Sequence, residues 1–160
     1  MDYSFAEYQI AEIAAQMEEE GFKFYRGLET LAKDDGVKIA FDTLARQELE
    51  HKANFLAIAA STKQENKEYE YSIDLCRIMN DAVGKLKRYA FDLKNHSNAS
   101  FNVRQALRLA INMEEEAIKI YGEIRNAFIE RFYGVLDSII AEEKKHLQIL
   151  KDLQAKLTPQ

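Results

Sequence analysis

The chain has 160 residues, of which 47% are hydrophobic and 31% charged, a composition typical of a globular protein with one buried core. Its formal net charge of −5 gives no reason to expect nucleic acid or an anionic membrane as a partner. The chain has no basic and apolar leader, no apolar run near the ~20 residues that span a bilayer, and no cysteine besides Cys76, which indicates a cytoplasmic protein.

Hydrophobic periodicity predicts long α-helices, in agreement with the small number of glycines (6) and prolines (1). In chain order, helices are expected at residues 4–32, 37–60, 73–93, 100–127 and 132–157. Ser4 and Ser100 are candidate N-caps, a turn is expected at residues 33–36, and loops are expected at 61–71 and 94–100. The second helix has these candidates for burial: Ile39, Phe41, Leu44, Phe55, Leu56 and Ile58.

Two segments of the chain are repeated. The nonapeptide MEEEGFKFY at residues 17–25 recurs as MEEEAIKIY at 113–121, and FDTLARQELEH at 41–51 is similar to LDSIIAEEKKH at 136–146. The repeat predicts one domain, residues 1–160, made of two helical hairpins at about 4–60 and 100–157. A partly helical crossover at 61–99 would join them. Two similar hairpins pack most simply as an all-α four-helix bundle.

Each nonapeptide contains three adjacent glutamates, and the helical neighbours three, four and seven positions away indicate which of them faces the core. Glu18 and Glu114 have apolar or aromatic neighbours and are expected to point inward. The others have mostly polar neighbours and are expected in solvent: Glu19, Glu20, Glu115 and Glu116.

The second helix of each hairpin carries a Glu-x-x-His pair that is expected to face inward. In the first hairpin His51 follows Glu48 by three residues, a rise of ~4.5 Å along the same helix face. In the second hairpin His146 follows Glu143 with the same spacing. Four carboxylates and two imidazoles are thus predicted to meet in one core, where an unpaired buried charge costs several kcal/mol.

Metal cations are the expected counter-charge of this core. The lysines and arginines nearby lie off the inward faces, whereas two divalent cations would balance the four carboxylates with both histidines neutral. Oxygen and imidazole ligands without thiolate suit iron or manganese and allow zinc. One Glu from each of two helices, with Glu-x-x-His from each of the other two, is the ligand pattern of dinuclear carboxylate centres. The alternative is a duplicated bundle whose polar core binds no metal.

The two nonapeptides and the ELEH and EKKH pairs resemble the rubrerythrin-like branch of the ferritin-like superfamily, over nearly the whole chain. The resemblance implies a ferritin-like bundle in which Glu48 and Glu143 bridge two iron ions. The remaining ligands would then be Glu18 and His51 on one ion and Glu114 and His146 on the other. Tyr25 and Tyr121 are either core tyrosines or hydrogen-bond donors to a ligand carboxylate across the bundle.

The resemblance also implies redox chemistry, and we expect reduction of hydrogen peroxide or dioxygen to water. Rubrerythrins proper carry a rubredoxin domain with a four-cysteine iron site, so here the electrons are expected from a separate donor protein. They also have a further glutamate where this chain has Ala117, whose repeat counterpart is Gly21. Two alternatives therefore stay open, a ferroxidase that handles iron and a non-catalytic zinc-binding or interaction protein. A homodimer is the expected assembly.

Overall fold

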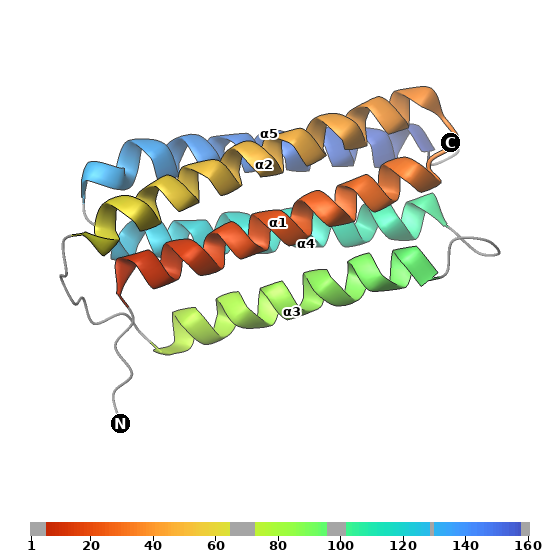
Figure 1. Cartoon of the computed structure of the whole chain (residues 1–160). Helices are drawn as coiled ribbons and strands as arrows, with labels where there is room; N and C mark the ends of the chain where they lie inside the picture. The colour runs from red at the N-terminus through yellow and green to blue at the C-terminus, as the bar shows by residue number, and fades with distance from the viewer. Residues whose placement is uncertain (1–5, 65–72, 96–101, 129, 158–160) are drawn as a thin grey trace.

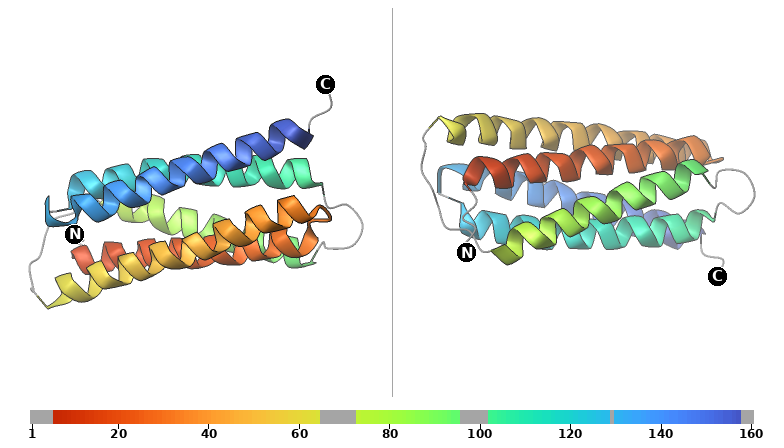
Figure 2. Two further views of the ribbon diagram at one scale, coloured as in Figure 1. Left: turned by 90° about the horizontal axis from the view of Figure 1, so that it is seen from above. Right: turned by 60° about the horizontal axis from the view of Figure 1, so that its bottom comes forward.

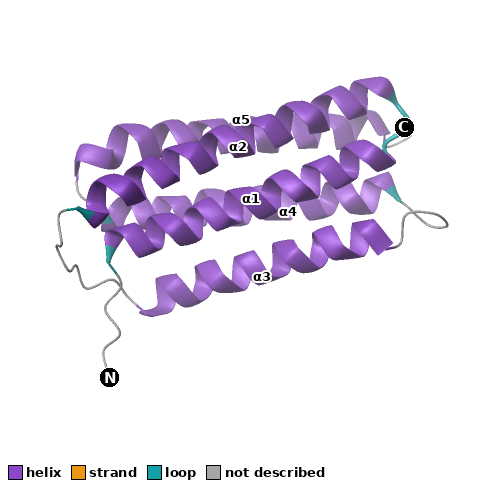
Figure 3. Ribbon diagram, in the orientation of Figure 1, coloured by secondary structure: helices purple, strands orange, loops and turns teal. Residues whose placement is uncertain are grey.

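The computed structural model describes residues 6–64, 73–95, 102–128 and 130–157, and within them it contains helices and no strand (Figure 3). The elements are α1 (Glu7–Leu31), α2 (Asp35–Lys63), α3 (Ile73–Asn95), α4 (Val103–Ala127), the 3₁₀ helix η1 (Glu130–Phe132) and α5 (Tyr133–Leu157). The all-α prediction is confirmed. None of the described helices is long and apolar enough to cross a membrane.

Helices α1, α2, α4 and α5 form a bundle, and α3 lies along one side of this bundle (Figures 1 and 2). Helix α1 packs along α2, and α4 packs along α5, so each predicted hairpin is present as a pair of neighbouring helices. The two pairs meet through α2 and α5. Helix α3, which belongs to the crossover, lies against α1 and α4 and covers the opposite side of the junction between the hairpins.

Helix α3 begins, and helices α4 and α5 end, at the predicted residues, but α1 and α4 begin later than predicted. Helix α1 begins at Glu7 after the N-cap Ala6, and α4 begins after Asn102, whose side chain accepts a hydrogen bond from the backbone of Arg104. The candidate caps Ser4 and Ser100 lie outside the described residues.

Helix α2 is longer than predicted at both ends. Asp34 in the expected turn caps it by accepting a hydrogen bond from the Val37 amide, which satisfies an otherwise unpaired donor. The helix continues to Lys63, so the loop predicted from residue 61 was wrong for its first residues. Thr62 there is buried, and its hydroxyl bonds to the Ile58 carbonyl at 2.9 Å. The polar composition of residues 61–63 did not distinguish a helical turn from a loop, because exposed helix faces are also polar.

Two of the residues expected in the core of α2 are exposed. Ile39 is 66% exposed and Leu56 is 46% exposed, whereas Phe41 and Phe55 are fully buried. The physical reason is angular: neighbours one or two positions apart on a helix point in different directions. The other candidates, Leu44 and Ile58, are buried as predicted.

A polar layer divides the apolar core into two clusters, one toward each end of the bundle. On α1, Ile10 and Met17 precede Glu18 and belong to one cluster, while Phe24 and Leu28 follow it and belong to the other. The other three bundle helices cross the same layer at the predicted inward glutamates and histidines. The fold therefore encloses these polar groups between two apolar regions.

Candidate metal centre

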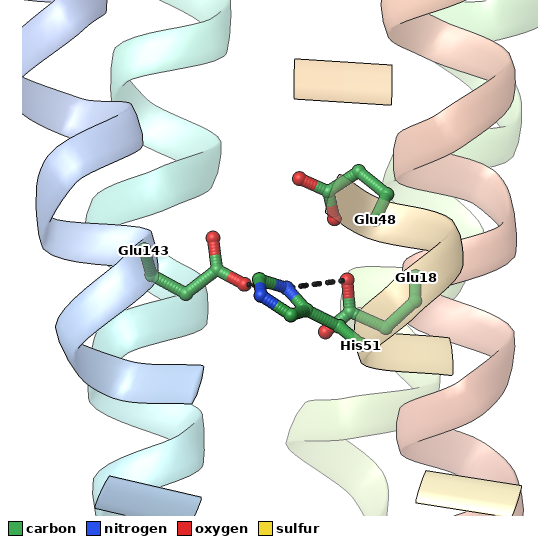
Figure 4. A group of neighbouring side chains, drawn as sticks. All are labelled: Glu18, Glu48, His51 and Glu143. Atoms are coloured by element: carbon green, nitrogen blue, oxygen red, sulfur yellow. Dashed lines mark ion pairs between the residues drawn. The ribbon is translucent and has the colours of Figure 1, made fainter. Parts of the chain in front are cut away.

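The structure brings all six predicted ligand residues together in the polar layer, and each is at most 5% exposed. They form two overlapping groups, each with its ligand atoms within 4.8 Å of one another. The first group is Glu18, Glu48, His51 and Glu143, whose side chains converge from α1, α2 and α5 (Figure 4). The second group is Glu48, Glu114, Glu143 and His146. Glu48 and Glu143 belong to both groups, the arrangement expected of two bridging carboxylates.

The Nδ1 atoms of both histidines face the shared carboxylates. His51 Nδ1 lies 2.8 Å from Glu143 Oε1, and His146 Nδ1 lies 3.0 Å from Glu143 Oε2. His146 Nδ1 is also 3.3 Å from Glu48 Oε1. The two imidazole rings stack with their centroids 5.5 Å apart. Two nitrogen donors and several carboxylate oxygens are thereby directed at one small volume.

Four buried polar atoms of the described residues have no hydrogen-bond partner, and all four belong to this layer. They are Glu48 Oε1, His51 Nδ1, Glu143 Oε1 and His146 Nδ1, so the short distance between His51 Nδ1 and Glu143 Oε1 is not a hydrogen bond. Because buried polar atoms are nearly always paired, such a concentration calls for a group that accepts their lone pairs. A divalent cation bound by oxygen and imidazole ligands fits this donor set.

Burial and the close approach of the carboxylates shift the pKa values of the groups in the polar layer. Burial, reinforced by Glu143, raises the pKa of Glu114 to about 8, and burial raises the pKa of Glu48 well above its usual value. Burial by itself lowers the pKa of His51, but the carboxylates of Glu143 and Glu18 outweigh it and raise that pKa to about 11. For His146 the same opposition, with Glu114 and Glu143 as the partners, raises the pKa to about 10.

Glu143 is the anionic centre of this arrangement. Burial alone would raise its pKa, but the adjacent His146 and His51 lower it well below the usual range. Glu143 therefore stays ionised between two protonated imidazoles. Cations would replace these protons, since metal ligands must be deprotonated.

The two tyrosines of the repeated nonapeptides donate hydrogen bonds across the bundle. The hydroxyl of Tyr25 on α1 bonds to Glu114 on α4, and the hydroxyl of Tyr121 on α4 bonds to Glu18 on α1. Burial and the carboxylate partner raise the pKa of each tyrosine well above its usual value, so both hydroxyls remain donors. Glu18 and Glu114, which we call the terminal glutamates because each belongs to only one of the two groups, are thus each oriented by a tyrosine of the other hairpin.

Sequence reasoning missed the partners of the second histidine nitrogens. His51 Nε2 lies 2.8 Å from Glu142 Oε2, and His146 Nε2 lies 3.1 Å from Gln47 Oε1. Gln47 and Glu142 occupy equivalent places in the repeat, each directly before a glutamate of the centre. That shared position was the available signal, but only the packing of α2 on α5 shows which histidine each one contacts.

A small cavity leads from the polar layer to the surface between α1, α3 and α4, and it has a volume of about 40 Å³. Its inner wall includes the four glutamates of the polar layer, and α3 contributes Ala82, Leu86 and Tyr89. At its outer side Lys85 Nζ lies 2.8 Å from Glu116 Oε1, and both side chains are partly exposed. A volume of this size holds about two or three water-sized molecules.

The remaining glutamates of the nonapeptides stay outside the polar layer. Glu19 pairs with Lys52 at 2.5 Å and Glu115 with Lys151 at 3.1 Å, near the solvent as expected. The expectation for Glu20 was wrong, because this residue is only 7% exposed. Its carboxylate lies at the edge of the buried face and accepts a hydrogen bond from Lys23 at 2.9 Å, which offsets the cost of burying its charge.

The rubrerythrin family model matches residues 10–154. The chain belongs to the rubrerythrin family. A crystal structure of a Thermotoga maritima protein described as a candidate ferritin-like diiron-carboxylate protein is similar in fold, with a TM-score of 0.71 and 22% sequence identity. The similarity covers 99% of this chain and 100% of that one. No curated protein sequence matches. The buried Glu and His cluster therefore lies in a ferritin-like member of the rubrerythrin family.

Proposed function

We propose that this protein is a di-iron oxidoreductase that reduces hydrogen peroxide or dioxygen to water. The observation that carries the proposal is the pair of overlapping groups that share Glu48 and Glu143 and leave four buried ligand atoms unpaired. Membership of the rubrerythrin family supports iron as the metal. Manganese and zinc accept the same ligand types.

The six residues would divide between two ions. Glu48 and Glu143 would bridge them, because both belong to the two groups. In the first position Glu18 and His51 would complete the ligand set. In the second position Glu114 and His146 would do so. Bound iron would supply electrons and Lewis acidity to the oxidant.

The surrounding residues select and shelter a small oxidant. The cavity of about 40 Å³ reaches the buried carboxylates and is too small for a bulky substrate. Tyr25 and Tyr121 hold the terminal glutamates, and the apolar clusters on both sides limit the access of water.

Hydrogen peroxide takes up two electrons and two protons to form two water molecules, and dioxygen takes up four electrons and four protons to do the same. A separate donor protein would deliver the electrons.

The test is metal analysis and absorption spectroscopy of protein purified without added metal. We expect two iron ions per chain and an absorption band that a reductant bleaches and peroxide restores. Glu143→Gln is the matched variant, because it removes the charge shared by both groups while preserving the shape of the side chain, and it should lose both ions. Stoichiometric zinc without a redox response would contradict the proposal and favour a non-catalytic protein.

A ferroxidase is the second candidate function, and Ala117 favours it. This residue lines the cavity one turn after Glu114, at the position where rubrerythrins proper have a further glutamate. A centre without that carboxylate has only the six ligands named above. Oxidation of many ferrous ions per chain within a large assembly would support the ferroxidase. Light scattering would detect such a large assembly. The same measurement would test the homodimer, which stays a prediction.

A further inference from the structure

The two histidines of the centre differ in the group that holds their outer ring nitrogen. Glu142 on α5 lies 2.8 Å from His51 Nε2, and Gln47 on α2 lies 3.1 Å from His146 Nε2. The internal repeat relates the two contacts, because Gln47 and Glu142 occupy equivalent positions and so do His51 and His146. One acceptor is a carboxylate and the other is a neutral amide.

Both contacts fix the same tautomer when a cation is bound. Each ring keeps its Nε2 proton to donate to Glu142 or Gln47, which leaves Nδ1 free to face the centre, where it has no hydrogen-bond partner. A carboxylate is the stronger acceptor, and it raises the electron density of the imidazole. His51 is therefore the better donor to a cation. The Glu142 side chain is 33% exposed, so solvent weakens its charge without removing it.

Two other kinds of contact are matched between the halves. Each terminal glutamate accepts a hydrogen bond from the tyrosine of the opposite hairpin, and both halves use the same two shared carboxylates. By contrast, the group that faces the histidine Nε2 differs in charge between the halves: Glu142 in one and Gln47 in the other. An inequality in metal binding should therefore follow that acceptor.

We infer that the two metal positions are inequivalent, and that the half with Glu18 and His51 binds its ion more tightly than the half with Glu114 and His146. Glu142 is the positioning residue responsible for the difference. The inference rests on the proposed metal centre.

Cobalt(II) titration of the metal-free full-length protein, followed by visible absorption and calorimetry, tests the inference. Glu114→Ala retains the half with His51, and Glu18→Ala retains the half with His146. We expect cobalt to bind Glu114→Ala about tenfold more tightly than Glu18→Ala, the scale on which a hydrogen-bond partner of a metal-bound histidine acts. Adding Glu142→Gln to Glu114→Ala should abolish this advantage. Adding Gln47→Glu to Glu18→Ala should raise its affinity by a similar factor.

The outcomes separate this inference from the proposed centre. Equal affinities of the two single variants, or an advantage that survives Glu142→Gln, would overturn the inference while the metal centre stood. Failure of the unaltered protein to bind cobalt would overturn the metal centre and the inference together. Circular dichroism of each variant checks that the bundle is folded. If an alanine variant does not fold, Glu142→Gln in the otherwise unaltered chain must still weaken binding of the first ion.

Discussion

The hydroxyl of Tyr121 on α4 donates a hydrogen bond to Glu18 on α1, in the opposite hairpin. Both side chains are 1% exposed, so the bond is buried in the core of the bundle. Tyr25 and Glu114 repeat the relationship in the other direction. Each hairpin thereby orients a carboxylate of its partner, and the polar layer depends on the correct packing of the two hairpins.

The first prediction concerns Tyr121→Phe. Phenylalanine preserves the ring that packs against Phe55 at a centroid distance of 5.1 Å, but it leaves the buried Glu18 carboxylate without its donor. The free energy of unfolding of the metal-free protein should fall by about 1–3 kcal/mol. Denaturant unfolding measures the change. Tyr8→Phe is the control, because the ring of Tyr8 lies under Lys63 away from the centre, and equal losses in both variants would refute the explanation.

The second prediction concerns Gly21→Ala. A β-carbon at Gly21 would lie 3.0 Å from Glu48 Oε2, so the alanine should displace this shared carboxylate. Cobalt affinity should fall about tenfold, on the scale of other perturbations next to metal ligands. Alanine is also favoured over glycine inside a helix by up to about 1 kcal/mol, so the metal-free protein should not be much less stable.

Gly122→Ala is the matched control for that substitution. A β-carbon at Gly122 meets nothing within 4 Å, so this variant should keep the cobalt affinity of the unaltered protein. Thermal unfolding should show equal or higher stability for it. If both alanine variants bind cobalt normally, the close approach to Glu48 has no consequence.

The third prediction is that metal binding releases protons and strengthens as pH rises. The pKa of His51 is raised to about 11, that of His146 to about 10 and that of Glu114 to about 8, so these groups carry protons near pH 7. The pKa of Glu48 is also raised well above its usual value by burial. Cations compete with the protons of the other three groups, so affinity falls as pH falls and about three protons leave when both positions fill at pH 7.

Calorimetric titration with zinc in buffers of different ionisation enthalpy measures the number of protons released. Affinities determined between about pH 6 and pH 8 give the slope independently, because each displaced proton changes the binding constant tenfold per pH unit. A binding constant that is flat over this range would contradict the protonated state of the metal-free centre.

The fourth prediction is that metal removal destabilises the fold. Ions that bind the native but not the unfolded chain stabilise by about 2.7 kcal/mol when their concentration is a hundred times Kd. A chelator should therefore lower the Tm of protein purified with its metal, and added zinc should restore it. Glu143→Gln should respond to neither treatment, since Glu143 belongs to both ligand groups. A Tm that chelation leaves unchanged would count against a resident metal.

Local periodicity was enough to predict that the carboxylates of Glu18 and Glu114 face the core. The neighbours of Glu18 and Glu114 are apolar at helical spacing, and the packing places both carboxylates inside. Periodicity failed where an angular position lies at the edge of the buried face. Glu20 became buried there, while Ile39 and Leu56 became exposed.

The sequence alone determined the helices, the duplication and the six inward-facing residues. Helical spacing and an internal repeat can be recognised along the chain without knowing how the helices pack. Only the tertiary structure decided that Glu142 contacts His51, that Tyr121 contacts Glu18, and that α3 covers the cavity beside the centre. These relationships join residues about 90 to 100 positions apart, and no local spacing encodes them. They follow from how the hairpins pack, because a side chain on one helix finds its partner only when the facing helix is fixed in direction and height.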